Sequence, residues 1–189
     1  VDKEAAGKLP AEYNVSDRDI SERFEFRNIE QTVARRAAAI EQCCFPPNEA
    51  CSEKNMLERI AVAQDFFLVA VDQETGRIAG FLNGIATDEC RFRDEFFTDA
   101  SLHNPEGRNI MLLGLDVLPE YRRQGLGREL VYHYLRRERE KCRQEVFLTC
   151  LHSKVKMYQK FGFVDRGIAD STWGGEEWHE MSYTLGSEY

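Results

Sequence analysis

The segment of this chain best suited to chemistry is a basic, glycine-containing turn at residues 122–127, Arg-Arg-Gln-Gly-Leu-Gly. An apolar run, Ile110–Leu118, precedes it, and an amphipathic stretch predicted to be helical from about Gly125 to Glu140 follows it. Glycines let backbone N–H groups face a ligand, and a helix N-terminus contributes about half a positive charge. This order of strand, turn and helix predicts a diphosphate site, to which Arg122, Arg123 and Arg128 add positive charge.

The glycine spacing alone does not identify a ligand, because it differs from the dinucleotide fingerprint and from the P-loop. A plain strand-to-helix connection remains an alternative. A second unit of the same kind follows in the chain. Glu145–Cys150 is predicted to be a strand, and a short helix capped by Ser153 is predicted to reach Tyr158 and to end near Gly162.

The composition is that of an ordinary soluble enzyme, with 42% hydrophobic and 31% charged residues. No apolar run approaches the roughly 20 residues that span a bilayer, and the polar N-terminus lacks a signal-peptide core, so we expect a cytoplasmic protein without membrane contact. None of the six cysteines forms a Cys-x-x-Cys pair, so no metal site is expected. The net charge of −8 disfavours nucleic acid and suits a cationic amine.

We expect residues 1–20 to be a flexible tail and residues 21–189 to form a single domain. Further strands are predicted near 24–29, 66–71, 77–86, 163–170 and 177–185, and helices after Thr32 and Ser52. Residues 87–107 fit either a short helix or a substrate-side loop. Mixed strands followed by a βαβ unit predict an α/β or α+β fold with helices on both faces of one sheet. Gly114, inside a strand, indicates either a bulge or close packing.

Two patterns carry a resemblance to a known family. Arg122, Gly125 and Gly127 match the pattern Arg/Gln-x-x-Gly-x-Gly/Ala, and residues 158–163 match Tyr-x-x-x-Gly-Phe. The chain thereby resembles the GNAT superfamily of N-acetyltransferases, and most nearly the serotonin (arylalkylamine) N-acetyltransferase-like group. The resemblance covers roughly residues 24–185 and is strongest over 102–163. It implies a mixed, twisted sheet of six or seven strands whose two central parallel strands splay apart, and acetyl-CoA as the co-substrate.

The resemblance also implies roles for individual residues. The pantetheine arm of the cofactor would pair with the first splayed strand, and the diphosphate would lie at the turn. The implied cofactor-binding residues are Leu115, Asp116, Val117, Arg122, Arg123, Gln124, Gly125, Leu126, Gly127 and Arg128. Tyr158 occupies the position of the general acid that protonates the departing thiolate, and its alternative role is that of a core tyrosine.

The general base of the family has no counterpart here, because the matching positions are Met111 and Leu113. His152, His179 or an ordered water chain are the candidates to replace it, although a single histidine is more often a surface or packing residue. Phe45 and Pro46 lie where the family builds its amine-binding loop. With Trp173 and Trp178 they are candidates for an aromatic wall around a cation or an aryl ring.

The leading hypothesis is transfer of an acetyl group from acetyl-CoA to a primary amine, by direct attack in a ternary complex. The acceptor would be a small (aryl)alkylamine or a polyamine, and the protein would be a monomer or a homodimer. Acetylation of protein N-termini or lysines is one alternative. A CoA-binding module without turnover is the other, and it is favoured by the missing base.

Overall fold

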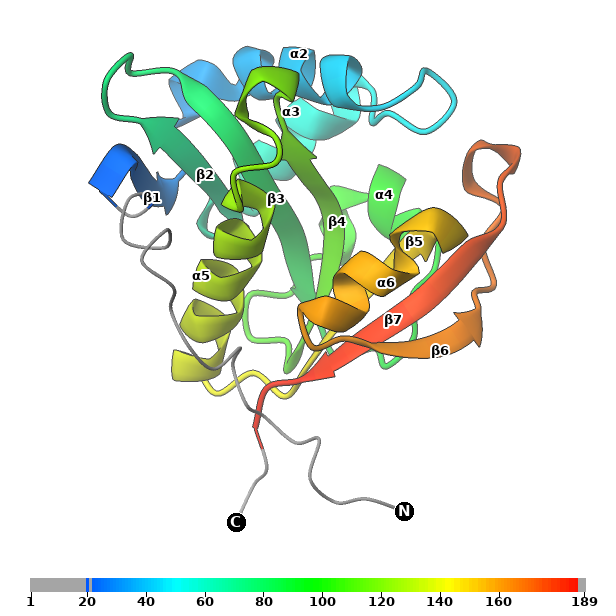
Figure 1. The fold of residues 1–189 in the computed structure, drawn as a ribbon. Helices are drawn as coiled ribbons and strands as arrows, with labels where there is room; N and C mark the ends of the chain where they lie inside the picture. The colour runs from blue at the N-terminus through cyan, green and yellow to red at the C-terminus, as the bar shows by residue number, and fades with distance from the viewer. Residues whose placement is uncertain (1–19, 21, 187–189) are drawn as a thin grey trace.

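The computed structural model of the chain describes residue 20 and residues 22–186. They form one seven-stranded mixed sheet in the order β1-β2-β3-β4-β5-β7-β6 (Figure 1). The strands are β1 (Phe24–Asn28), β2 (Phe67–Asp72), β3 (Ile78–Thr87), β4 (Asn109–Val117), β5 (Glu145–Leu151), β6 (Val164–Ile168) and β7 (Trp178–Thr184). Residues 1–19 of the expected tail lie outside the described residues, whereas Ile20 is buried in the core.

The α-helices are α2 (Ala34–Cys44), α3 (Glu53–Val62), α4 (Glu95–Thr98), α5 (Leu126–Glu140) and α6 (His152–Lys160). Short 3-10 helices connect them at η1 (Gln31–Val33), η2 (Gln64–Phe66), η3 (Ala100–Leu102), η4 (Pro119–Tyr121) and η5 (Trp173–Gly175). The segment 87–107 thus contains a short helix, one of the two expected forms. No helix in the described part of the chain is long and apolar enough to cross a membrane.

Helices cover both faces of the sheet, as expected. Successive residues of a strand point to opposite faces. The side chain of Asn83 on β3 accepts a hydrogen bond from Arg59 of α3, at 2.9 Å, whereas its neighbour Gly84 faces the hydroxyl of Tyr134 on α5. The α2–α3 pair and α5 therefore pack on opposite sides, and α5 and α6 both lie in front of the sheet in Figure 1.

A bulge in β4 opens the centre of the sheet. The antiparallel register of β3 and β4 shifts between Asn83, which pairs with Gly114, and Gly84, which pairs with Leu112, so Leu113 is the extra residue. The parallel pairing of β4 with β5 covers only three residue pairs, which end at Met111 and Phe147. Beyond that point the two strands splay apart, which confirms the expected splay. The bulge lies at Leu113, next to Gly114.

Local signals in the sequence set most of the helix ends. Ser52 caps α3 by accepting a hydrogen bond from the Asn55 backbone N–H at 3.1 Å. Phe45, in an extended conformation before two prolines, ends α2. The expectation that Ser153 caps α6 is wrong. The N-cap is the extended residue Leu151, because β5 runs directly into the helix and places Ser153 inside its first turn.

The pairing of β3 and β4 at the bulge leaves no space for a side chain on Gly84. A Cβ atom there would lie 2.6 Å from the Met111 carbonyl oxygen and 3.1 Å from the Tyr134 hydroxyl. We expect Gly84→Ala to lower the free energy of unfolding by about 1–3 kcal/mol, measured by urea denaturation. Gly186→Ala is the matched control, because a Cβ atom there meets nothing within 4 Å. Equal stability of the two variants would contradict the tight packing at the bulge.

Candidate active site

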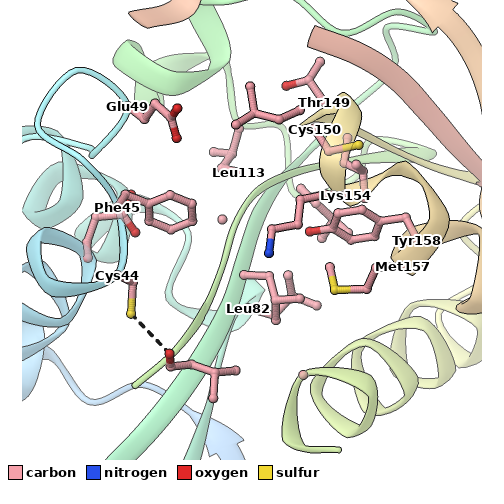
Figure 2. A pocket seen from close by; sticks show the side chains of 18 of the residues that line it. Cys44, Phe45, Glu49, Leu82, Leu113, Thr149, Cys150, Lys154, Met157 and Tyr158 are labelled. Atoms are coloured by element: carbon pink, nitrogen blue, oxygen red, sulfur yellow. Dashed lines mark hydrogen bonds between the residues drawn. The ribbon is translucent and has the colours of Figure 1, made fainter. Parts of the chain in front are cut away.

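The splay between β4 and β5 opens into a cavity of about 600 Å³ (Figure 2). This volume is typical of sites for small molecules and cofactors. Its walls come from four places in the chain: the end of α2 with the loop after it, the bulged half of β4, the turn that begins α5, and the junction of β5 with α6. Phe97 of α4 and Trp173 of η5 also line it.

The turn before α5 has the backbone that its glycine-containing sequence predicts. Gly125, the N-cap of α5, has a φ of 83°, and Arg123 has a φ of 60°, a strained value for a residue with a side chain. Among the described residues, no protein acceptor receives the backbone N–H groups of Leu126 and Gly127. These donors face a cavity that Arg122, Arg123 and Arg128 also line.

Gly127 lies directly against the splayed strand. A Cβ atom at this position would lie 3.8 Å from side-chain carbons of both Leu115 and Val117. Of the residues expected to bind the cofactor, only two do not line the cavity, namely Gln124 and Asp116. The Gln124 side chain donates to the Glu120 carbonyl oxygen, and Asp116 alternates to the face opposite Leu115.

The carbonyl of Val117 already has partners in the protein. It accepts hydrogen bonds from the Arg122 side chain at 2.9 Å and from the Cys44 thiol at 3.5 Å, the latter drawn in Figure 2. Burial raises the pKa of Cys44, so this group is a neutral thiol at pH 7. A ligand amide that pairs with the Val117 carbonyl oxygen must share it with these donors or displace one of them.

Tyr158, the expected general acid, points its hydroxyl into the cavity from α6 (Figure 2). Burial raises the pKa of Tyr158 well above its ordinary value, and the nearby Cys150 and Asp116 add to the effect. The phenol therefore keeps its proton at pH 7. Burial also raises the pKa of Cys150 to about 12, which makes it an inert thiol.

An acidic and aromatic wall lies across the cavity from Tyr158. Phe45, Pro46 and Trp178, expected from the sequence to contact the amine, all line the cavity. Glu49 directs its carboxylate toward the cavity in Figure 2. The Trp173 indole N–H donates to the Glu49 carbonyl oxygen at 2.9 Å, which ties the α2–α3 loop to the loop before β7.

The two candidate histidines meet each other but do not line the cavity. His152 Nδ1 lies 3.3 Å from His179 Nε2, and His179 Nδ1 lies 3.2 Å from both carboxylate oxygens of Asp165. His179 follows Trp178, which faces the cavity, and strand alternation turns His179 the other way. No group of three metal-binding side chains occurs among the described residues.

Several lining residues were not singled out from the sequence. Glu41 and Cys44 reach the cavity from α2, at the i, i+3 spacing that places residues on one helix face. Lys154 directs its ammonium group into the cavity from α6 (Figure 2). Helical periodicity marks the buried face of α2, but it does not show that this face ends at a cavity.

Comparisons with known proteins now identify the family. Residues 34–163 match the sequence model of the Acetyltransferase (GNAT) family. The chain belongs to the GNAT acetyltransferase family. Its sequence is 33% identical over 113 residues to the serotonin N-acetyltransferase of Mesocricetus auratus, a match that covers 59% of this chain and 53% of that protein. The chain thus spans about half the length of this curated relative.

Solved structures show the same fold. The loading GNATL domain of CurA from Lyngbya majuscula superposes with a TM-score of 0.72 at 17% identity, over 86% of this chain and 98% of that one. The GNAT-like decarboxylase GphF, in complex with isobutyryl-CoA, superposes with a TM-score of 0.71 at 18% identity, over 86% of this chain and all of that one. This GNAT chain therefore has the seven-stranded, splayed architecture that its sequence predicts.

The position of Gly127 generates a binding prediction. A Cβ atom there meets only ordinary contacts, so alanine fits, whereas the γ carbons of valine would extend toward the cleft beside Leu115. We expect Gly127→Val to weaken CoA binding at least tenfold, or about 1.4 kcal/mol, in calorimetry. Gly127→Ala should stay within about threefold of the wild type. If both variants bind CoA as the wild type does and keep its melting temperature, the CoA phosphates do not bind at this turn.

Proposed function

We propose that the protein transfers an acetyl group from acetyl-CoA to the primary amine of a small cation, an (aryl)alkylamine or a polyamine. The observation that carries the proposal is the division of charge around one cavity. Basic residues and free N–H groups lie at the α5 turn, and Glu41 and Glu49 lie at the α2 side. A phosphate-bearing thioester and an ammonium group therefore have separate, complementary places.

The residues present fit coenzyme A. The turn at Arg122–Gly127 supplies backbone donors and positive charge for a diphosphate. The splay leaves the second half of β4 unpaired on the side of β5, where an extended chain with amide groups can form backbone hydrogen bonds. The extended arm of coenzyme A would then run from the turn at Gly127 through the cavity toward Tyr158.

The opposite wall suits a primary ammonium group on a short apolar chain. Phe45, Trp173 and Trp178 provide aromatic surface beside the Glu49 carboxylate. Burial raises the pKa of Glu49, and the neighbouring Glu176 carboxylate raises it further. A bound ammonium group would relieve this repulsion, which favours cationic acceptors over neutral ones.

The reaction then proceeds by direct attack. The amine nitrogen attacks the thioester carbonyl carbon, the C–S bond breaks, and the departing sulfur takes the proton of the Tyr158 hydroxyl. Before attack, a primary alkylamine must lose a proton, because its pKa resembles that of lysine, near 10.4. The nitrogen then loses its second proton, which passes through solvent to Tyr158 and restores the phenol.

A colorimetric assay of free thiol, run with acetyl-CoA and a panel of amines, tests the proposal. We expect thiol release with small alkylamines, arylalkylamines or polyamines, and mass spectrometry should find the acetylated amine. Turnover of peptide N-termini or lysine peptides alone would favour the protein-acetylating alternative. CoA binding in calorimetry without turnover of any acceptor would favour a binding module.

Tyr158→Phe removes the proposed proton donor without changing the shape of the wall. We expect kcat to fall about 10²–10⁴-fold while the Kd for CoA stays unchanged. Because the pKa of Tyr158 is raised, the phenol stays protonated through pH 10, so wild-type kcat should show no decline from this group between pH 7 and 10. Unaltered turnover in Tyr158→Phe would show that another group protonates the sulfur.

A further inference from the structure

Two carboxyl groups that take no part in the acetyl-transfer steps at Tyr158 meet in the interior beside the cavity. Glu41 of α2 and Asp116 of β4 have exposed fractions of only 5% and 0%. Both carboxyl groups lie beside Gly114. A Cβ atom at this glycine would be 3.2 Å from Asp116 Oδ1 and 3.7 Å from Glu41 Oε2. Glu41 and Gly114 both line the cavity.

The pair is short of hydrogen-bond donors. Glu41 Oε1 accepts the Cys51 backbone N–H at 3.1 Å, but Glu41 Oε2 and both Asp116 oxygens have no donor among the described residues. Buried carboxylate oxygens without donors are strongly disfavoured. A proton held between the two carboxyl groups satisfies one oxygen of each, and burial together with the Glu41 carboxylate raises the pKa of Asp116 well above its usual value.

The surrounding charges balance when only one of the two carboxyl groups is ionised. The buried guanidinium of Arg59 donates to Asn83 Oδ1 at 2.9 Å and to the Phe97 carbonyl oxygen at 2.8 Å, and Asn83 in turn donates to the Gly114 carbonyl oxygen. The titratable groups around Glu41 are Asp116, Arg59, Cys44 and Cys51. Burial raises the pKa of both thiols, so one cation faces one carboxylate and one carboxylic acid.

The geometry points to Glu41 as the group that takes the first proton from the substrate ammonium, with Asp116 as a positioning residue whose shared proton fixes the Glu41 carboxylate at the cavity wall. This inference rests on the proposed acetyl transfer. The N–H bond of the ammonium breaks, its electron pair stays on nitrogen, and the proton forms an O–H bond with the Glu41 carboxylate. After acetyl transfer this proton leaves to solvent.

This arrangement supplies what the central strand lacks. The side chains of Met111 and Leu113 on β4 cannot accept a proton, whereas Glu41 reaches the same bulge from the neighbouring helix. At pH 7 only about one in 10³ to 10⁴ molecules of a primary alkylamine is neutral. A carboxylate at the reaction centre lets the abundant cation bind and react.

The test is the pH dependence of kcat for Glu41→Gln with two kinds of acceptor. With a primary alkylamine we expect kcat at pH 7 to fall about 10²–10³-fold and to rise about tenfold per pH unit between pH 6 and 9, where the wild type is nearly flat. With an alkoxyamine, which is neutral at pH 7, the same variant should stay within about fivefold of the wild type. CoA affinity and melting temperature should be unchanged.

Glu49→Gln is the matched control, because Glu49 lines the same cavity but is only partly buried. It should raise KM for the alkylamine and keep the flat pH profile of kcat. Glu41→Asp retains a carboxylate and should retain that profile at reduced kcat. It also serves as the second variant if Glu41→Gln does not fold.

The outcomes separate the two proposals. If the wild type is active and the pH profile of kcat for Glu41→Gln runs parallel to that of the wild type, the role of Glu41 is overturned. Acetyl transfer then still stands. An equal loss with both acceptors also overturns the role of Glu41, because a merely structural role would produce that loss. A wild type that turns over no amine overturns the proposed function, and the role of Glu41 with it. Loss confined to the cationic acceptor, with the steep pH profile, supports the inference.

Discussion

The site depends on one interruption of backbone pairing in the middle of the sheet. After three residue pairs β4 and β5 separate, because Leu113 is extra in β4 and turns the strand at Gly114. Unpaired backbone groups inside a sheet are costly unless another partner satisfies them. The splay therefore creates both a cavity and a demand for an extended, amide-bearing ligand. The helices that follow the two strands, α5 and α6, bring the glycine-containing turn at residues 122–127 and Tyr158 to the same cavity.

The arrangement of charge around the opening has the same origin. The basic turn comes after β4 and belongs to the connection into α5, whereas Glu41 and Glu49 come from α2 and the loop after it. Although α2 and α5 pack on opposite faces of the sheet, both groups of charges line one cavity at the splay. The net charge of −8 is thus only weak evidence for the kind of ligand. The separation of positive charge at the α5 turn from negative charge at α2 decides which end of a ligand each part of the cavity can bind.

Features that depend on neighbouring residues in the chain were predictable from the sequence. The backbone of the glycine-containing turn at residues 122–127, the cap at Ser52 and the break after Phe45 each follow from a few residues and their φ preferences. The pairing of Glu41 with Asp116 could not be predicted, because it joins a helix and a strand far apart in the chain. Strand alternation turns Asp116 away from the side of Leu115, but it does not show which residue Asp116 meets there. The failure of the Ser153 cap has a similar cause, since a continuous path of β5 into α6 decides where the helix begins.

Stability alone does not account for the two buried carboxyl groups. Replacing such a pair with apolar residues is often neutral or stabilising, so a buried carboxyl pair is weak support for the fold. Three oxygens without donors lie beside a glycine that leaves room for them, and one of the two side chains reaches a cavity wall. Departures from the usual rules of burial concentrate at functional sites. Moving the proton acceptor from the central strand to α2 keeps Met111 and Leu113 apolar at the bulge and holds a carboxylate within reach of the same point.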